Sequence, residues 1–463
     1  MSNSPPPWGA NSFGYLAACG REFHSNDVAS IASNILNLQI HNSNNKAIII
    51  TIIYWISGDE SYIANQQIIM GDVIMKEGIE PLVNDGFAGE PPTKRCLSYL
   101  QAQREKGKHV VGIYCGYAPM EVIRAAGLVP AVLCAFADKT IAAGETVLPA
   151  NLCPLIKSSY GFIKTDTCPF YAISEVVIAE TTCDGKKKMF ELIADVKPTH
   201  VMDLPQLPDQ KEALENWSKM IKKLGGFLEK TFDCKITDAG VAQEIKNTNL
   251  KNKLLNEIFD FAVLKPVPLT WQEIYDLTYF GQVATTEDMM PLLEGALATL
   301  QKRVADGVYH GEKDSPRVLV TGCPVGGDAT KVFKVIEEAG GVIVCLDSCT
   351  GMKAYAGHFD ENAADLYQSV SRRYLDVPCS CMTPNSKRLT ELDRMIKKFH
   401  PDVVIDVVLH ACHSYNIESQ KVKAHIEGKH KMPFLKIETD YSQGDVEQIR
   451  TRVEAVLETV PKK

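Results

Sequence analysis

Short apolar segments alternate with amphipathic segments in the first half of the chain. Short apolar segments, the first of them with β-branched residues, predict strands at 109–114, 129–134, 175–180 and 199–205. Apolar residues at helical spacing lie between or after these strands, at 118–127 and 187–196. Strand–helix–strand alternation of this kind predicts a parallel sheet that is covered by helices.

The same alternation returns in the last third of the chain. Strands are expected at 317–322, 342–347, 402–410 and 433–440, with helices at 328–341, 385–400 and 445–460. The long amphipathic stretches within 210–307 predict a helical layer between the two halves. We therefore expect an α/β chain with two parallel-sheet domains of related architecture. The expected boundaries are an atypical N-terminal extension at 1–60, a first α/β domain at 61–209, a helical connector at 210–314 and a second α/β domain at 315–463.

Composition and charge argue against several classes of protein. Hydrophobic residues make up 45% of the chain and charged residues 23%, as in ordinary soluble globular proteins. The net charge of −8 offers no basic excess for binding the phosphates of nucleic acid. The longest apolar run, at 47–56, has about ten residues, whereas a bilayer-spanning helix needs about 20. The first residues also lack the pattern of a signal peptide, so we expect a cytoplasmic protein that binds neither nucleic acid nor membrane.

Cysteine is the residue type that points to chemistry. The chain has 14 cysteines, and in a long chain from a reducing compartment such thiols are more often metal-binding or catalytic than disulfide-bonded. Ligands bind beyond the carboxyl ends of strands in open α/β sheets, so many thiols at such ends predict a metal site. Any single thiol could equally be a small buried hydrophobic side chain. Six cysteines follow the carboxyl end of a predicted strand: Cys115, Cys134, Cys183, Cys323, Cys349 and Cys412.

The spacing of the thiols favours an iron–sulfur cluster over zinc. Structural zinc sites usually contain close CxxC pairs, and this chain has none. The candidate thiols are spread over both halves with one in each loop, and Cys153 and Cys379 add two more in loops beside proline. This arrangement suits a cluster held between two domains, and soft thiolates are the ligands that iron–sulfur clusters prefer.

Motifs for binding nucleotide phosphates are missing from the sequence. The segment GCPVGGDA at 322–329 has the glycine spacing of a phosphate-binding loop, but Asp328 stands where a lysine is required. No GxGxxG motif follows a predicted strand. We therefore expect that this chain does not itself hydrolyse ATP.

Three consecutive lysines, Lys186, Lys187 and Lys188, follow Cys183 closely. They lie at the predicted start of a helix, which is the unfavourable end for positive charge. They are either a solvated first turn, or they offset the negative charge of a thiolate-bound cluster or of a partner's surface. The sequence leaves both interpretations open.

Several longer segments of the chain resemble a known family. LCPLIKSSYGF, ETTCDGKKKMF, VTGCP, VPCSCMTPN, ACHSYNIES and IETDYSQGD are together similar to the double-cubane-cluster reductases. These enzymes are a branch of the 2-hydroxyacyl-CoA dehydratase and benzoyl-CoA reductase superfamily, and the similarity runs from about residue 108 to the C-terminus. The resemblance implies two Rossmann-like domains with an oxygen-sensitive iron–sulfur centre between them. It further implies an anaerobic, homodimeric oxidoreductase that reduces small molecules with low-potential electrons from a separate ATP-hydrolysing iron–sulfur activator protein.

The resemblance also implies which thiols bind the cofactor. Matching the motifs gives, as the ligands of one cubane, Cys153, Cys183 and Cys412. In the double-cubane branch two cubanes share a bridging sulfide to form an [8Fe-9S] cluster, and six thiolates hold it. For the second cubane we expect Cys115, Cys323 and Cys349. Cys115 ends the first strand of the first domain and Cys323 ends the first strand of the second domain, so two sheets that face each other across a cleft bring them close together. Cys349 follows the second strand of the second domain. Cys379 is the reserve ligand.

Two other functions compete with the reductase. One is a 2-hydroxyacyl-CoA dehydratase subunit, which is a lyase with a single [4Fe-4S] cluster and an open iron for the substrate. The extra cysteines at 115, 323, 349 and 379 favour the reductase. The other is a thiol-rich metal-storage or scaffold protein. Two well-formed α/β domains argue against storage, because storage requires no cleft.

Overall fold

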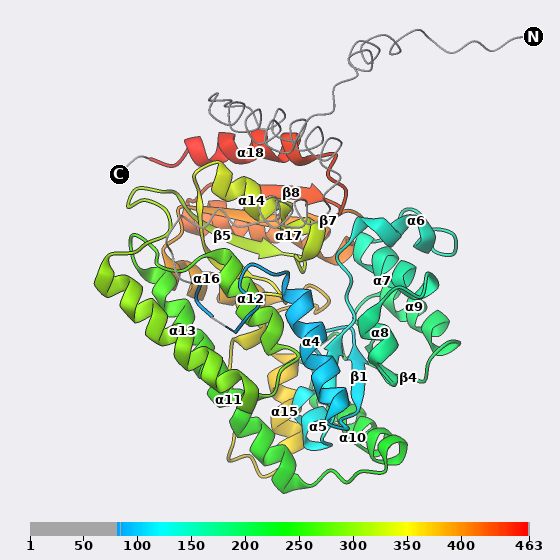
Figure 1. The fold of residues 1–463 in the computed structure, drawn as a ribbon. Helices are drawn as coiled ribbons and strands as arrows, with labels where there is room; N and C mark the ends of the chain where they lie inside the picture. Colours follow the sequence, from blue (N-terminus) through cyan, green and yellow to red (C-terminus); the bar gives the residue numbers. More distant parts are fainter. Residues whose placement is uncertain (1–80, 84, 462–463) are drawn as a thin grey trace, which may run out of the picture. The chain divides into compact units, whose positions relative to one another are not determined.

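The structure is a computed structural model that describes residues 81–83 and 85–461 (Figure 1). The expected N-terminal extension at 1–60, with its apolar run, lies outside these residues. Among the residues that are described, no helix is long and apolar enough to cross a membrane.

The first sheet forms from the β-branched segments of the first half. It has four parallel strands in the order β2-β1-β3-β4. Valine and isoleucine side chains of β1 and β3 are buried along the whole of these two strands, as expected for a parallel sheet covered on both faces. The strand bounds are β1 Val110–Ile113, β2 Val129–Val132, β3 Val176–Glu180 and β4 Thr199–Met202.

The second sheet repeats this arrangement, with four parallel strands in the order β6-β5-β7-β8. Both sheets therefore start from an inner strand, place the second strand on one side of it and the third and fourth on the other. The α/β class and the repeated architecture expected from the sequence are confirmed, whereas the domain boundaries stay predictions. The strand bounds are β5 Arg317–Gly322, β6 Val342–Asp347, β7 Val403–Leu409 and β8 Phe434–Thr439.

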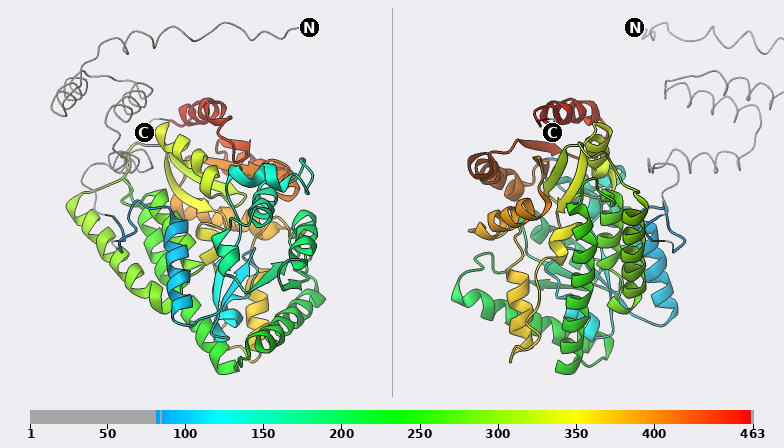
Figure 2. Two further views of the ribbon diagram at one scale, coloured as in Figure 1. Left: turned by 45° about the vertical axis from the view of Figure 1, so that its right-hand side comes forward. Right: turned by 90° about the vertical axis from the view of Figure 1, so that its left-hand side faces the viewer.

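The three long amphipathic stretches form helices α10, α11 and α13, and the shorter helix α12 joins them in the connecting layer (Figure 2). Helix α11 packs against α13 and against α5 of the first half, while α10 packs against α15 of the second half. The side chain of Thr270 accepts a hydrogen bond from the backbone of Glu273, whose carboxylate reaches back to the Thr270 amide and completes a capping box at the start of α12. The bounds are α10 Lys211–Phe232, α11 Asp238–Asp260, α12 Trp271–Gly281 and α13 Thr286–Asp306.

The remaining helices cover the two sheets. In the first half they are α4 Pro92–Glu105, α5 Met120–Ala125, α6 Ile141–Gly144, α7 Pro154–Lys164, α8 Pro169–Ile173 and α9 Asp184–Ala194. In the second half they are α14 Lys331–Glu338, α15 Leu366–Leu375, α16 Ser386–Phe399, α17 His413–His425 and α18 Val446–Glu458. Short 3₁₀ segments are η1 Asp138–Thr140, η2 Phe261–Val263, η3 Gly327–Thr330 and η4 Met352–Tyr355, and a π-helical turn, η5, spans Ile426–His430.

The strand order reverses at equivalent places in the two sheets, between β1 and β3 and between β5 and β7. Open α/β sheets bind their ligands at such switch points. At the second one the backbone is tightly packed: Gly322 has φ +122°, and a Cβ there would lie 2.0 Å from the Val407 carbonyl oxygen. Glycine is therefore required directly before Cys323, at the edge where a ligand is expected.

Candidate functional site

Six cysteines lie just beyond the carboxyl ends of strands, as the sequence predicts. Each is one to three residues past the end of its strand. Because all strands of a sheet run parallel, each sheet brings its three thiols to a single edge. The strands and their thiols are β1 with Cys115, β2 with Cys134, β3 with Cys183, β5 with Cys323, β6 with Cys349 and β7 with Cys412.

Three of the thiols form the Cys412 group, which consists of Cys153, Cys323 and Cys412. The Cys412 side chain interacts with both Cys153 and Cys323. The amide of Leu409 donates a further 3.3 Å hydrogen bond to the Cys323 sulfur. Cys153 comes from the first half of the chain and the other two from the second half, so this group joins the halves.

A second set of thiols surrounds Cys379 in the loop between β6 and β7. The Cys381 thiol hydrogen bonds to Cys379 and lowers its pKa, and the Lys353 ammonium contributes to the same effect. Cys115, Cys183 and Cys349 each experience the charge of Cys379 as well. Cys379 and Cys381 together with Lys353 thus favour one thiolate at this place, and thiolate is the form that binds metal.

The repeated architecture makes the thiols of the two halves equivalent in pairs. Cys115 and Cys323 follow the first strand of each sheet, and Cys134 and Cys349 follow the second. In each half, further thiols lie in the connection from the second to the third strand, and one more thiol follows the third strand. The strand-end pairs are Cys115 with Cys323, Cys134 with Cys349, and Cys183 with Cys412. The connection from the second to the third strand contains Cys153 and Cys168 in the first half and Cys379 and Cys381 in the second, and of these we pair Cys153 with Cys379.

The three lysines after Cys183 have different surroundings. Lys187 and Lys188 are exposed and form ion pairs along the helix with Asp184 and Glu191. Lys186 is buried, and its ammonium donates a 2.9 Å hydrogen bond to the Tyr114 carbonyl oxygen. Of the two interpretations, the solvated turn applies to Lys187 and Lys188, while Lys186 turns its charge toward the thiols.

Opposing influences act on the buried charge of Lys186. Burial lowers its pKa, but Cys134, Cys115 and Cys183 together with Glu180 outweigh burial and raise the pKa well above its usual value. Burial raises the pKa of the Glu180 carboxyl to about 8, opposed by Lys186. Negative charge on the neighbouring sulfurs therefore stabilises the Lys186 ammonium, and the buried Glu180 carboxyl takes up a proton more readily than an exposed glutamate does.

A second buried lysine, Lys353, reaches the site from η4. Its ammonium lies 3.4 Å from Asp347 Oδ1, and both side chains are only 1% exposed. Asp347 in turn accepts a 2.6 Å hydrogen bond from Thr321. No sequence pattern points to Lys353, because it lies in an irregular segment without a recognisable motif.

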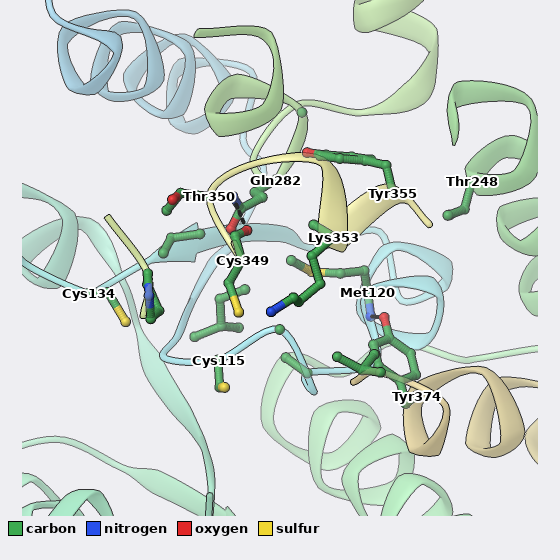
Figure 3. Close-up of a pocket in the computed structure, with 18 of the residues that line it drawn as sticks. Cys115, Met120, Cys134, Thr248, Gln282, Cys349, Thr350, Lys353, Tyr355 and Tyr374 are labelled. Atoms are coloured by element: carbon green, nitrogen blue, oxygen red, sulfur yellow. Dashed lines mark hydrogen bonds between the residues drawn. The ribbon is translucent and has the colours of Figure 1, made fainter. Parts of the chain in front are cut away.

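A cavity of about 130 Å³ opens beside these groups (Figure 3). The sulfurs of Cys115, Cys134 and Cys349 face it, and Figure 3 shows the Lys353 nitrogen directed toward Cys349. On the opposite wall Glu121 accepts hydrogen bonds from Thr248 at 2.9 Å and from Tyr374 at 3.0 Å. The cavity is therefore large enough for a small molecule next to thiols and ammonium groups.

Residues of the first half occupy the space beside the 322–329 loop, whose glycine spacing resembles that of a phosphate-binding loop. A Cβ at Gly327 would lie 2.3 Å from the Phe136 carbonyl oxygen, and one at Gly326 would lie 2.8 Å from the Phe136 ring. The Asp328 carboxylate accepts a 2.8 Å hydrogen bond from the Asp138 amide. Asp328 therefore joins the two halves of the chain at the place where a phosphate-binding lysine would stand.

Comparison with known proteins gives the family. The sequence profile of HGD-D, "2-hydroxyglutaryl-CoA dehydratase, D-component", matches residues 115–460. The chain belongs to this family. It is 40% identical over 357 residues to "Putative dehydratase subunit YjiM" of Escherichia coli (strain K12), which covers 77% of this chain and 92% of that protein.

More distant relatives carry two kinds of name. The chain is 22% identical over 379 residues to the "(R)-phenyllactyl-CoA dehydratase beta subunit" of Clostridium sporogenes, covering 80% of this chain and 96% of that protein. It is also 22% identical over 246 residues to one of the subunits of benzoyl-CoA reductase from Thauera aromatica, covering 52% of this chain and 62% of that protein. The superfamily expected from the motifs is confirmed, and it includes both dehydratases and reductases.

Proposed function

We propose that this protein is an iron–sulfur reductase that holds a double-cubane [8Fe-9S] cluster between its two halves. Low-potential electrons would come from an ATP-hydrolysing activator protein, and the reductase would act on small molecules. The convergence of thiols from both halves on one place is the observation that carries the proposal. When bound, the cluster would supply electrons at low potential, and the protein would hold it through thiolates and nearby positive charge.

The donor set fits such a cluster. Thiolate is the ligand type that iron–sulfur clusters prefer, and the cluster with its thiolates is anionic. The buried ammonium groups of Lys186 and Lys353 lie among these thiols and would offset that negative charge. The amide of Leu409, which donates to the Cys323 sulfur, is the kind of hydrogen bond that tunes a cluster's potential.

The pairing of the repeat supports a specific set of ligands. We assign the Cys412 group, Cys153, Cys323 and Cys412, to one cubane. Exchanging each member for its equivalent in the other half gives the second set, Cys379, Cys115 and Cys183. In each set two thiols come from the strand ends of one half and one from a loop of the other half. Relative to the sequence expectation, this assignment regroups the thiols and replaces Cys349 with its reserve, Cys379.

The cavity supports a small substrate. Its volume of about 130 Å³ corresponds to roughly ten water-sized atoms, far fewer than a complete acyl-CoA contains. It adjoins the thiols on one side and the Glu121, Thr248 and Tyr374 wall on the other. A substrate there would lie within reach of the electrons, with the Lys353 ammonium beside it.

A second candidate is a 2-hydroxyacyl-CoA dehydratase subunit with a single [4Fe-4S] cluster. The names of the relatives favour it, because two of them are dehydratase subunits of CoA thioesters. In that case only one set of thiols would carry iron. The cavity would receive the acyl end of the substrate, and the CoA would lie outside it.

Iron and sulfide analysis of anaerobically purified protein separates the two candidates. We expect about eight irons and nine sulfides per chain, with ATP-dependent reduction of small test substrates once the activator is added. About four irons per chain would favour the dehydratase, and zinc as the only bound metal would overturn both. The further expectations of a homodimer and a cytoplasmic location are checked by light scattering and cell fractionation.

A further inference from the structure

Three side chains outside the thiol site converge on a single point of the second half. Asp393 lies on α16, His425 is the last residue of α17, and His430 ends the π-helical turn η5. The Nε2 atoms of His425 and His430 lie 2.7 Å and 2.6 Å from the same oxygen, Oδ1 of Asp393. Among the described residues, these three are the group of at least three His, Cys, Asp or Glu side chains whose possible ligand atoms all lie within 4.8 Å of one another.

The π-helical turn is what brings the two histidines together. On a regular α-helix, side chains five positions apart point about 140° away from each other, because successive residues are about 100° apart. A π turn closes over five residues, so positions 425 and 430 come to the same side. Such turns are rare and occur frequently at functional sites. The backbone irregularity therefore serves the convergence of these two rings.

We propose that Asp393, His425 and His430 bind a divalent transition-metal ion of the zinc type. Two neutral imidazoles and one carboxylate are a common protein ligand set for such ions, and three protein ligands leave a position for water. The side chains are 17%, 19% and 26% exposed for His425, His430 and Asp393, so an ion can reach them from solvent. Nothing in the family comparison assigns a role to this group.

The geometry needs only a small adjustment. In a tetrahedral site with bonds of about 2.05 Å, neighbouring ligand atoms are about 3.3 Å apart, so the side chains would separate by roughly 0.6 Å. Both histidines already direct Nε2 at the same carboxylate oxygen. The other oxygen, Oδ2, accepts a 2.6 Å hydrogen bond from the Lys429 ammonium. Lys429 orients the carboxylate, but its positive charge also opposes the binding of a cation.

This group is separate from the thiol site, so the inference does not rest on the proposed function. Helix α17 begins directly after Cys412 and ends at His425. Its 13 residues, at about 1.5 Å each, place the two ends about 20 Å apart. A bound ion would join the C-terminal end of α17 to α16. It would thereby hold α17 in place, and the N-terminal end of α17 directly follows Cys412, a proposed cluster ligand.

Zinc content of the intact protein tests the proposal. Full-length protein with its native cofactor is purified anaerobically, treated with a mild chelator, equilibrated with micromolar zinc and analysed for zinc and iron. Because free thiols also bind zinc, the decisive quantity is the difference between wild type and His430→Ala. We expect about one zinc fewer per chain in His430→Ala and in His425→Ala, with unchanged iron. Loss of a residue that merely hydrogen bonds to a ligand weakens metal binding about 10–100-fold, so loss of a ligand should weaken it at least 100-fold.

Two further variants test whether a change in zinc content is specific to this site and whether it could come from misfolding. His410 is an exposed histidine that lies 3.2 Å from Glu438 and outside the group, so His410→Ala should keep wild-type zinc content. Lys429→Met removes the competing ammonium and should bind zinc more tightly than wild type, a gain that a misfolded protein cannot produce. Equal zinc content in wild type, His425→Ala and His430→Ala would overturn the proposal, as would unchanged affinity in Lys429→Met. Either result would leave the three side chains as a hydrogen-bonded ion pair only.

Discussion

The ammonium nitrogen of Lys186 lies 4.0 Å from the sulfur of Cys134. The two groups also share an acceptor, since the Tyr114 carbonyl oxygen receives hydrogen bonds from Lys186 at 2.9 Å and from the Cys134 thiol at 2.8 Å. The positive charge of a buried ammonium lowers the free energy of the more negatively charged states of the site relative to the less negatively charged ones. It therefore favours the reduced over the oxidised form of any cluster bound there.

Replacing Lys186 with methionine should lower the reduction potential of the cluster. At an effective dielectric constant of about 20, a unit charge about 8 Å away contributes roughly 2 kcal/mol, or about 90 mV for one electron. Redox titration followed by electron paramagnetic resonance measures the shift. Lys188→Met is the matched control, because Lys188 is exposed and paired with Glu191, and it should leave the potential within about 10 mV of wild type. Equal potentials in both variants would contradict the electrostatic role of Lys186.

Much of the fold could be predicted because it depends on local patterns. All eight described strands fall within the segments that were expected to be strands, and β7 is buried along its whole length. The amphipathic sequence of α16 predicts a helix, whereas that of α17 does not. The α17 sequence HSYNIESQKVKAH has few apolar positions, so its helical structure depends on packing against β7 and β8. Patterns of period 3.6 find amphipathic helices and overlook polar ones.

The positions of the thiols could also be predicted, but their grouping could not. Strand ends place Cys323 and Cys412 at neighbouring points of one edge, which follows from sheet order alone. Contacts between the two halves depend on how the halves pack, and no local pattern encodes that. The approach of Cys153 to Cys412 and the arrival of Lys353 at the cavity are therefore visible only in three dimensions.

The isolated chain should not bind ATP, even after the missing lysine is restored. The space above the 322–329 loop is occupied by Phe136, and Asp328 is hydrogen bonded to the Asp138 amide. Asp328→Lys would lose that bond without opening room for phosphates. Calorimetry should show no ATP binding by either protein at concentrations up to about 1 mM, with the ATP-hydrolysing activator as the positive control. Micromolar ATP affinity of the wild-type chain would contradict this prediction.

Gly322→Ala should destabilise the second half of the protein strongly. The added Cβ would lie 2.0 Å from the Val407 carbonyl oxygen, which accepts a 2.8 Å hydrogen bond from the Cys323 amide. Since β5 and β7 would have to separate, we expect a loss of about 3 kcal/mol or more. Gly340→Ala is the control, because Gly340 also has a positive φ, +88°, but no atom lies within 4 Å of the place that its Cβ would take. It should cost only about 1–2 kcal/mol. Thermal unfolding temperatures that do not differ between the two variants would contradict the steric argument.

The pairing of the repeated halves makes a further prediction about the second cubane. Cys349 corresponds to Cys134 of the first half, whereas Cys379 corresponds to Cys153. Since Cys153 belongs to the Cys412 group, its equivalent Cys379 should be the ligand. Its neighbours Cys381 and Lys353, which favour a thiolate at this place, point the same way.

Single serine variants at these two positions decide between them. Cys379→Ser should lose about half of the iron, keeping about four irons per chain on the Cys412 group, because an iron corner loses its anchor. Cys349→Ser should keep the complete cluster and its visible absorption, since Cys349 would only border the cavity. Alanine variants of Cys153, Cys183 and Cys412 serve as positive controls, and each should strip or damage the cluster. Full iron content in Cys379→Ser together with loss in Cys349→Ser would reverse the assignment and restore the ligand that strand order alone suggests.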